Sequence, residues 1–197
     1  MKRNSKNIHT KVPPLLNRLT NPSRILELGC GVGNDSLYFS EQGHIFTETD
    51  FSNVVIAQNS QKYMLPNLTF FMLDIAQPFP YNGHAFDVVY ARLSLHYFAD
   101  EVTKQIFTEI HRVLIPGGML CFMCKSVKDS SYGEGKLIEK DMYDFNGHVR
   151  HFFSEEYARE CLNGLFRDTS IVSEDEVLYG KQSADVKVIA YKEEQIR

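Results

Sequence analysis

Short apolar runs alternate with amphipathic segments along most of the chain, and this alternation predicts strands followed by helices. Five runs are typical of strands buried in a parallel sheet: about residues 24–28, 44–49, 68–73, 85–90 and 118–125. Apolar residues at helical spacing predict helices between them: about residues 33–42, 52–63 and 101–114. The order predicts an α/β fold, with a mostly parallel, doubly wound sheet covered by helices on both faces.

Residues with capping chemistry stand at the ends of the predicted helices. Gly43 is expected just after the first helix, and Ser52 and Asp100 are expected at the N-termini of the next two. A last helix is predicted to begin at Ser154 and to end near Gly164. Beyond it, the segments at about 166–178 and 185–191 alternate enough to form a closing antiparallel pair.

The connection from residue 126 to residue 151 is too long for a turn. Long loops inside compact domains are usually functional or disordered, and this one follows a strand whose carboxyl end borders the ligand edge of an open α/β sheet. We therefore predict a lid on the substrate side. Residues 1–23 would add at most one further helix to it, so the 197 residues are expected to form a single domain.

The first predicted strand turns into the first helix through three alternate glycines. Gly29, Gly31 and Gly33 let a ligand approach bare backbone, because they carry no Cβ. A dinucleotide fingerprint would need its third glycine one position later, where the chain has Asn34. Glu27, just before the glycines, would repel a pyrophosphate and suit a cationic ligand. The pattern therefore opposes an NAD-linked oxidoreductase.

The run from Glu27 to Gly33 resembles the first motif of the class I S-adenosylmethionine-dependent methyltransferases. Later segments resemble the same family in order, up to about Lys125. The resemblance implies a Rossmann-like sheet of seven strands with the last strand reversed, and S-adenosylmethionine as the cofactor. Residues 33–39 are also similar to tellurite-resistance-type and other small-molecule methyltransferases.

The resemblance also implies which residues hold the cofactor. Asp50 would accept hydrogen bonds from the ribose hydroxyls, and Asp74 from the adenine amine. The full set of candidate cofactor residues is Glu27, Gly29, Cys30, Gly31, Gly33, Asp50, Phe51, Asp74, Ile75 and Ala91. Each carboxylate has a structural alternative: Glu27 as a cap of the glycine loop, and Asp50 and Asp74 as ordinary turn residues.

Methyl transfer from a sulfonium is an in-line displacement, so the enzyme mainly has to position donor and acceptor. The segment 91–98 follows the fourth strand and should line the pocket where the two meet. Arg92 is a candidate for orienting an anionic acceptor or the cofactor carboxylate, with a surface ion pair as its alternative. His96 is a candidate general base, with an ordinary pKa near 6.5, or else a buried histidine satisfied by backbone.

On the substrate side, the candidates are Tyr97 and the lid residues Tyr132, Tyr143, His148 and His151. The tyrosines favour an aromatic or apolar acceptor, or else they close the core of the domain. The segment after the fourth strand lacks the Asn/Asp-Pro-Pro-Tyr/Phe pattern of amino-methylating relatives, which opposes a DNA base as acceptor.

Composition limits the partners. A formal net charge of −4 opposes a nucleic-acid partner, and no apolar stretch approaches the ~20 residues that span a bilayer. Cys121 and Cys124 form a C-x-x-C, but residues three apart on a strand face opposite sides, so no metal site is expected. We expect a cytoplasmic monomer or homodimer.

Two functions remain from the sequence. The first is methyl transfer from S-adenosylmethionine to a small-molecule acceptor. The alternative is a non-catalytic S-adenosylmethionine-binding sensor or partner subunit, which would keep the glycine loop and the same acids. An open acceptor pocket under residues 126–151 would favour the enzyme.

Overall fold

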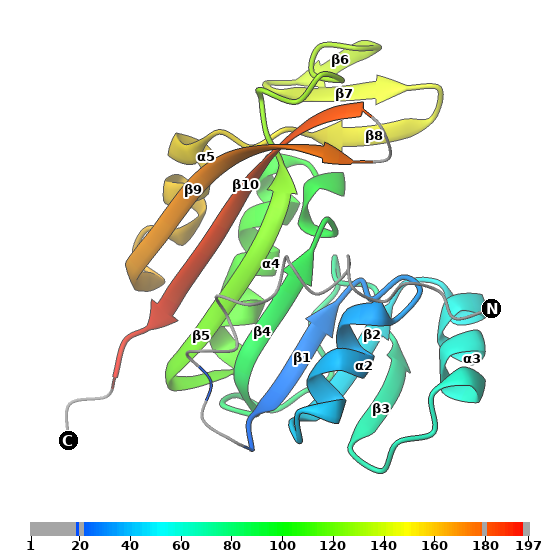
Figure 1. Ribbon diagram of the computed structural model, residues 1–197. Coiled ribbons are helices and arrows are strands. Elements are labelled where there is room, and N and C mark those ends of the chain that lie inside the picture. Colours follow the sequence, from blue (N-terminus) through cyan, green and yellow to red (C-terminus); the bar gives the residue numbers. More distant parts are fainter. Residues whose placement is uncertain (1–18, 20–21, 179–180, 195–197) are drawn as a thin grey trace.

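A seven-stranded sheet forms the centre of the computed structural model, which describes residues 19, 22–178 and 181–194 (Figure 1). Within these residues its strands are β1 (Arg24–Leu28), β2 (Ile45–Asp50), β3 (Leu68–Met72), β4 (Phe86–Arg92), β5 (Leu114–Lys125), β9 (Phe166–Leu178) and β10 (Lys181–Lys192). The strand order is β3-β2-β1-β4-β5-β10-β9, and β10 runs antiparallel to both neighbours while the remaining pairs are parallel. The predicted seven-stranded sheet with a reversed last strand is confirmed.

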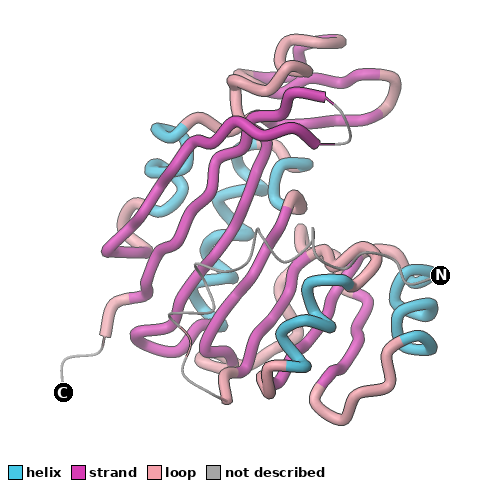
Figure 2. The backbone as a smooth tube through the Cα atoms, in the orientation of Figure 1, coloured by secondary structure: helices cyan, strands magenta, loops and turns pink. Residues whose placement is uncertain are grey.

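Helices cover both faces of this sheet (Figures 1 and 2). They are α2 (Asn34–Glu41), α3 (Asn53–Lys62), α4 (Asp100–Val113) and α5 (Glu155–Leu162). Successive side chains of a strand point to opposite faces, so Val89 and Ala91 of β4 pack in the core beneath α4 and α5. Val88 and Tyr90 pack in a second core with Phe39 of α2. The predicted double covering of the sheet is confirmed.

Most of the predicted helix ends are also confirmed. Ser52 Oγ accepts a hydrogen bond from the Val55 amide at 3.4 Å, and Ser154 Oγ accepts one from the Tyr157 amide at 3.0 Å. These bonds satisfy amides that the first helical turn leaves unpaired. Gly43 follows α2 with a φ of +89°, as a residue just beyond a helix commonly does.

The prediction that Asp100 caps α4 is wrong. The helix begins at Asp100, and Ala99 occupies the capping position without a side-chain bond. The Asp100 carboxylate instead accepts hydrogen bonds from Lys104 at 2.7 Å and from the Tyr157 hydroxyl at 2.9 Å. The Asp100 amide donates to the Glu139 carboxylate at 2.7 Å, so a residue distant in sequence supplies the cap.

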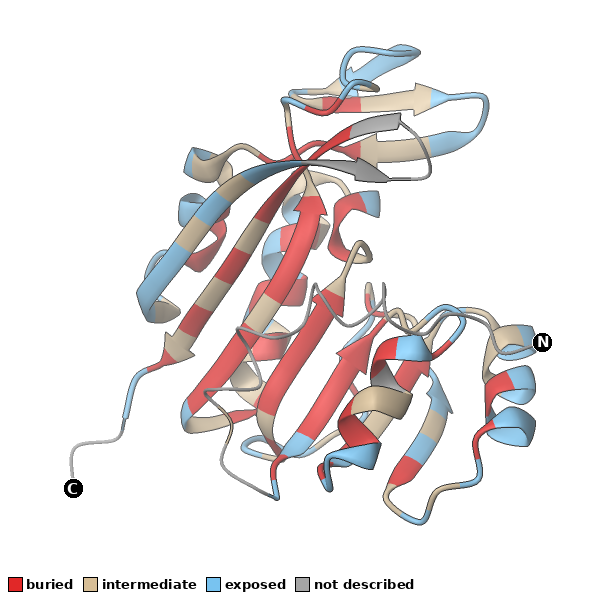
Figure 3. Ribbon diagram, viewed as in Figure 1, coloured by how far each residue is buried: buried red, intermediate tan, exposed pale blue. Residues whose placement is uncertain are grey.

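Residues 126–151 contain a small antiparallel sheet that the sequence analysis treated only as a long connection. Its strands are β6 (Lys136–Glu139), β7 (Met142–Phe145) and β8 (His148–His151), and we call them the lid sheet. Asp141 and Asn146 turn the chain between the strands with positive φ. Figure 3 shows that most of the lid sheet is exposed or half-buried, unlike the buried central strands. Residues 1–23, expected to extend the lid, lie outside the described residues except 19, 22 and 23.

The final strand also holds the helix beside it. Lys192, at the end of β10, is 8% exposed, and its Nζ donates to the carbonyls of His111 at 2.7 Å and Leu114 at 2.8 Å. Carbonyls at the C-terminus of a helix have no partner within the helix, and a lysine can satisfy them. Lys192 therefore ties β10 to the end of α4.

Two negative findings concern the described residues alone. None of their helices is long and apolar enough to cross a membrane. No three of their His, Cys, Asp and Glu side chains converge as metal ligands. On β5, Cys124 packs in the core beneath α4 and α5 while Cys121 packs against the opposite core, so the two thiols face opposite sides of the sheet.

Candidate functional site

The loop between β1 and α2 is built from glycines in the left-handed region of φ. Gly29, Gly31 and Gly33 have φ values of +78°, +53° and +72°. A Cβ on Gly29 would lie 2.5 Å from the Ser94 Cβ, so glycine is required there for the close approach of the segment after β4. Around Gly31 the space for a Cβ is open. The loop thus offers bare backbone at Gly31 and tight packing at Gly29.

Neighbouring elements hold the glycine loop in place. The amides of Gly29 and Cys30 both donate to the Thr49 carbonyl of β2 at 2.9 Å. From α3, Asn59 Nδ2 donates to the Gly31 carbonyl at 2.8 Å, and just after α3 the Tyr63 hydroxyl donates to the Val32 carbonyl at 3.2 Å. These bonds fix the loop before any ligand arrives.

Asp50 connects the end of β2 to the glycine loop. Its Oδ2 accepts a hydrogen bond from the Gly31 amide at 3.0 Å, and its Oδ1 accepts one from the Ser52 amide at 2.9 Å. A carboxylate has about four lone-pair positions, so the two oxygens retain capacity for hydroxyl donors. The neighbouring Phe51 is 75% exposed, which leaves an aromatic ring available beside the acid.

The ends of β3 and β4 complete the same edge. After β3, Asp74 Oδ1 accepts from the Ala76 amide at 3.0 Å, which is the turn role foreseen as its alternative. After β4, Leu93 adopts a φ of +56°, and the Ser94 hydroxyl donates to the Leu28 carbonyl at the end of β1. The bond from Ser94 draws the segment after β4 against the glycine loop.

A cavity of about 670 Å³ opens where these segments meet. Its volume lies within the range of small-molecule and cofactor sites. It is found at the carboxyl ends of β1 to β4, where the strand order reverses and open α/β folds bind their ligands. It is lined by Gly29, Cys30, Gly31, Val32, Asp50, Phe51, Leu73, Asp74, Ile75, Arg92, Leu93, Ser94, Tyr97 and Phe98.

Nine of the residues singled out from the sequence therefore line one cavity: Gly29, Cys30, Gly31, Asp50, Phe51, Asp74, Ile75, Arg92 and Tyr97. Three candidate cofactor residues are not in its lining. Glu27 is 2% exposed and Ala91 is fully buried, each in the strand behind the cavity wall. Gly33 packs against α3, where an added Cβ would lie 2.9 Å from the Tyr63 ring.

Arg92 lies at the cavity with part of its guanidinium unused. Its Nη1 is 3.5 Å from Asp35 Oδ2, an atom that also accepts from the Tyr90 hydroxyl at 3.1 Å. Burial, and next the Asp35 charge, raises the pKa of Tyr90, so this hydroxyl stays protonated. Arg92 Nε is buried without a hydrogen-bond partner. A buried charged donor without a partner is costly, and a ligand anion would relieve that cost.

His96 does not line the cavity. It is 1% exposed, and its Nδ1 accepts a hydrogen bond from the Lys125 amide at 3.3 Å. Burial, and then the positive charges of Arg150 and Lys125, lower the pKa of His96 to about 3. Its ring lies beside the ring of Tyr97, with centroids 4.6 Å apart. A neutral, buried ring bonded to backbone favours the structural alternative for His96.

The four lid candidates do not line this cavity either. Tyr132 and Tyr143 pack edge to face with each other and with Phe152, at centroid distances of 5.4 to 6.1 Å. His148 is exposed, whereas His151 is buried and its Nδ1 donates to the Phe98 carbonyl at 3.2 Å. Phe98 belongs to the cavity wall, so the lid sheet is attached directly beside the cavity.

Leu93, Ser94 and Phe98 line the cavity and belong to the segment 91–98, which the sequence analysis expected to line the pocket, although none of the three was named as a site residue. Val32 and Leu73 also line it and were not named. Asn59 on α3 and Tyr63 just after it support the glycine loop and gave no signal, because their roles depend on packing between elements.

Comparison with known proteins finds similarity to methyltransferases. Residues 26–122 match the profile of a family described as a methyltransferase domain. A malonyl-[acyl-carrier protein] O-methyltransferase of Salmonella typhimurium is 26% identical over 155 residues, covering 76% of this chain and 57% of the relative. A tRNA N(3)-methylcytidine methyltransferase of Drosophila melanogaster is 27% identical over 166 residues, covering 77% and 51%. The chain thus spans just over half the length of these curated relatives.

Solved structures share the fold. An S-adenosylmethionine-dependent methyltransferase of Methanosarcina mazei superposes with a TM-score of 0.77 at 19% identity, over 93% of this chain and 98% of the other. A Burkholderia thailandensis 1,6-didemethyltoxoflavin N1-methyltransferase, solved with its substrate and S-adenosylhomocysteine, gives 0.68 at 22% identity, over 93% and 75%. The sheet order, the glycine loop at the switch point and these matches lead to one assignment. Residues 26–122 form a methyltransferase domain of the class I S-adenosylmethionine-dependent type, whose methyl donor is S-adenosylmethionine.

Proposed function

We propose that this protein transfers the methyl group of S-adenosylmethionine to a small-molecule acceptor. The observation that carries the proposal is the cavity of about 670 Å³, in which the glycine loop, Asp50 and Asp74 converge at the switch point of the sheet. Its lining fits the cofactor: bare backbone at Gly31, acceptors for hydroxyl and amine donors, and an unpaired guanidinium nitrogen at Arg92.

Each part of the cofactor has a proposed partner. Asp50 accepts from the ribose hydroxyls, while Asp74 and the Ile75 amide meet the adenine, with the exposed Phe51 ring beside them. The Arg92 guanidinium, 30% exposed at the cavity, donates to the methionine carboxylate, and Asp35 holds it in place. Glu27 stays a candidate for the methionine ammonium, through water or loop rearrangement, because its side chain lies behind the wall.

The reaction asks mainly for positioning. When bound, S-adenosylmethionine supplies a methyl group on a sulfonium, a good leaving group that needs no protein nucleophile. The preformed glycine loop orients the donor, and holding two reactants in near-attack geometry contributes about 7–11 kcal/mol to lowering such a barrier. Tyr97, 48% exposed at the cavity, is the side chain we place nearest the acceptor. His96 supports Tyr97 through ring contact.

A small acceptor is favoured by several observations. The formal net charge of −4 lacks the excess of positive charge that nucleic-acid binding uses. One relative is named for a malonyl group on acyl-carrier protein and one structural neighbour for 1,6-didemethyltoxoflavin, whereas another relative is a tRNA methyltransferase. We also propose that the lid sheet covers the acceptor side. A cytoplasmic location and a monomeric or homodimeric state stay predictions.

Calorimetric titration with S-adenosylmethionine and S-adenosylhomocysteine tests the proposal. We expect binding by the native chain, loss of most affinity in Asp50→Ala, and no change in Asp175→Ala, which alters an exposed acid on β9. Absence of binding to either compound would overturn the cofactor assignment.

The alternative function is a sensor or partner subunit that binds the cofactor without turnover. To distinguish this alternative from the enzyme, the protein is mixed with S-adenosylmethionine and with either pools of small metabolites or tRNA. The S-adenosylhomocysteine that forms is then measured. Product formed by the native chain and not by Asp50→Ala would support the enzyme. Binding without product from any pool, including tRNA, would favour the sensor.

A further inference from the structure

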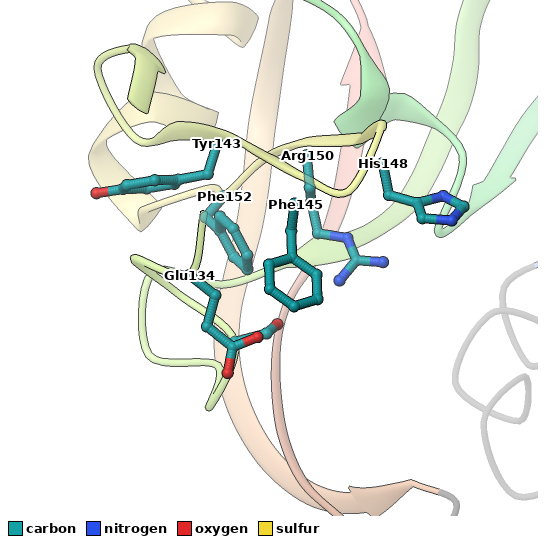
Figure 4. A pocket seen from close by; sticks show the side chains of 7 residues that line it. Glu134, Tyr143, Phe145, His148, Arg150 and Phe152 are labelled. Carbon is teal, nitrogen blue, oxygen red and sulfur yellow. The ribbon is translucent and has the colours of Figure 1, made fainter. Parts of the chain in front are cut away.

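A second cavity lies on one face of the lid sheet (Figure 4). In the antiparallel pairing of β7 with β8, Tyr143 lies opposite Arg150 and Phe145 lies opposite His148, so their four side chains share a face. With Ser131, Glu134 and Phe152 they enclose about 200 Å³. The cavity is separate from the cofactor cavity, with which it shares no lining residue.

Arg150 is the unexplained group in this cavity. Its Nε is buried and has no hydrogen-bond partner, and among the described residues its guanidinium forms no ion pair. Its recorded contact is with the Phe152 ring, whose centroid is 6.0 Å away. A buried, charged donor is normally paired, because an unpaired one loses its hydration without compensation. Arg150 as a whole is half-buried, so its guanidinium has unused donors that a ligand anion in the cavity could take up.

The aromatic side chains of the lid cavity indicate what kind of group the ligand carries beside its negative charge. Figure 4 shows Arg150, Phe145 and Phe152 pointing to the same side of the lid sheet, toward Glu134. Phe145 is 51% exposed, so its ring is available for contact. Aromatic rings stack well against a flat, unsaturated ligand. His148 lies at the edge of the lining, and its imidazole points away from the two phenylalanine rings.

The charge of Glu134 and the volume of the cavity limit the class of ligand further. Glu134 lines the same cavity yet forms no ion pair with Arg150 within 4.0 Å, so its carboxylate repels a second negative charge on the ligand. A volume of about 200 Å³ is below the range for drug-sized ligands. A guanidinium matches a carboxylate with two parallel hydrogen bonds.

We propose that this lid cavity binds a small aromatic monocarboxylate, with Arg150 on the carboxylate and the exposed Phe145 against the ring, above the buried Phe152. Arg150 and His151 are consecutive on β8, so their side chains point to opposite faces of the lid sheet. His151 bonds to Phe98 of the cofactor cavity, and Arg150 faces the lid cavity on the other side. The lid cavity is therefore a binding site of its own, and it does not rest on the proposed function.

The test is calorimetric titration of the full chain, saturated with S-adenosylhomocysteine, with three probes. Benzoate carries the single charge, benzamide is its neutral counterpart, and isophthalate carries a second carboxylate. We expect benzoate to bind about tenfold or more tightly than either of the others, because a charge-assisted pair is worth at least a factor of ten. Equal binding of benzoate and benzamide, or no benzoate binding, would overturn the proposal.

Variants locate the binding. Arg150→Gln should weaken benzoate about tenfold, Glu134→Gln should preserve or strengthen it, and Arg159→Gln, an ion-paired arginine on the surface of α5, should leave it unchanged. Unchanged S-adenosylhomocysteine affinity in each variant shows that the chain is folded. Benzoate affinity unaffected by Arg150→Gln would contradict the site.

The titration also separates the two proposals. A chain that binds no S-adenosylhomocysteine would lose the proposed function, and benzoate binding in its absence would still decide the lid site. A chain that binds S-adenosylhomocysteine and no benzoate would keep the proposed function and lose this inference.

Discussion

Two glycines of the same loop have different reasons to be glycine. Both have positive φ, which costs other residues about 1–2 kcal/mol. In Gly29→Ala the new Cβ also collides with Ser94, so we expect a loss of about 2–5 kcal/mol in the free energy of unfolding. In Gly31→Ala we expect the free energy of unfolding to fall by only about 1–2 kcal/mol. The larger effect should be a loss of cofactor affinity, because the new Cβ enters the cavity. Urea unfolding and S-adenosylhomocysteine titration measure the two quantities.

A second substitution isolates the collision. Ser94→Gly removes the Cβ that Gly29→Ala would strike, so the double variant should recover part of the lost stability. Ser94→Gly should give no such recovery to Gly31→Ala. Equal stability losses in the two single variants would contradict this account.

His96 makes stability depend on pH. Its pKa of about 3 in the folded chain is below the ordinary 6.5, so between these values the unfolded chain binds more protons. The free energy of unfolding is therefore full above pH 6.5 and falls as the pH drops below it. From pH 7 to pH 5 this group alone should remove about 2 kcal/mol.

Urea unfolding at pH 7 and pH 5 measures this contribution. The variant His96→Gln should lose about 2 kcal/mol less than the native chain between the two pH values, since every other titrating group is common to both. An identical pH dependence would show that His96 is not buried as a neutral ring. His148→Gln, on the exposed part of β8, serves as the control.

Among the elements, β10 has a role beyond closing the sheet. Replacing its terminal lysine in Lys192→Met would leave the His111 and Leu114 carbonyls without their donor. We expect about 1–3 kcal/mol of destabilisation in urea unfolding. Lys187→Met, on the same strand, removes an exposed ion pair with Glu174 and should change stability by less than about 1 kcal/mol. Equal effects would contradict the assigned role of Lys192.

The elements that were predicted well are specified by residues close together in the sequence. The strand β4 is a continuous apolar run, which is typical of a strand buried on both faces. Ser52 and Ser154 cap their helices through bonds to amides three residues away. The lid sheet has strands of four residues with mixed polarity, so periodicity could not reveal it. The cap of α4 was mispredicted because Glu139, 39 residues from Asp100, supplies it.

At the scale of the whole molecule, polar bonds join the lid sheet to the rest of the domain. One of them is the Glu139 carboxylate at the amide of Asp100, a favourable position for a negative charge at a helix N-terminus. In Glu139→Ala we expect faster amide hydrogen exchange across residues 136–151 and unchanged exchange in β1. Mass spectrometry after deuterium labelling measures both segments.

The control for this prediction is Lys140→Ala, an exposed neighbour on the lid. It should leave the exchange of residues 136–151 as in the native chain. Faster exchange in Lys140→Ala, or none in Glu139→Ala, would show that the carboxylate does not hold the lid.

The site residues that could be predicted are those that lie next to a predicted strand end in the sequence. The glycine loop, Asp50 and Asp74 lie next to predicted strand ends, and parallel strands bring such ends to one edge. Ser94 was expected only as part of the segment 91–98, and Asn59 escaped notice, because each meets the glycine loop only in the folded chain. His96 shows the opposite error, since its residue type suggested chemistry that burial opposes.

The order of the site along the chain has a consequence for its ancestry. The residues that we assign to the ribose and adenine of the donor all precede residue 76. The segments that we assign to the acceptor follow residue 91. The turn between β3 and β4 is the natural junction of the two halves. A single recombination there would preserve the contacts to the ribose and adenine of the donor, and it would replace the acceptor segments together with Arg92. Its descendants would inherit one methyl donor and explore new acceptors.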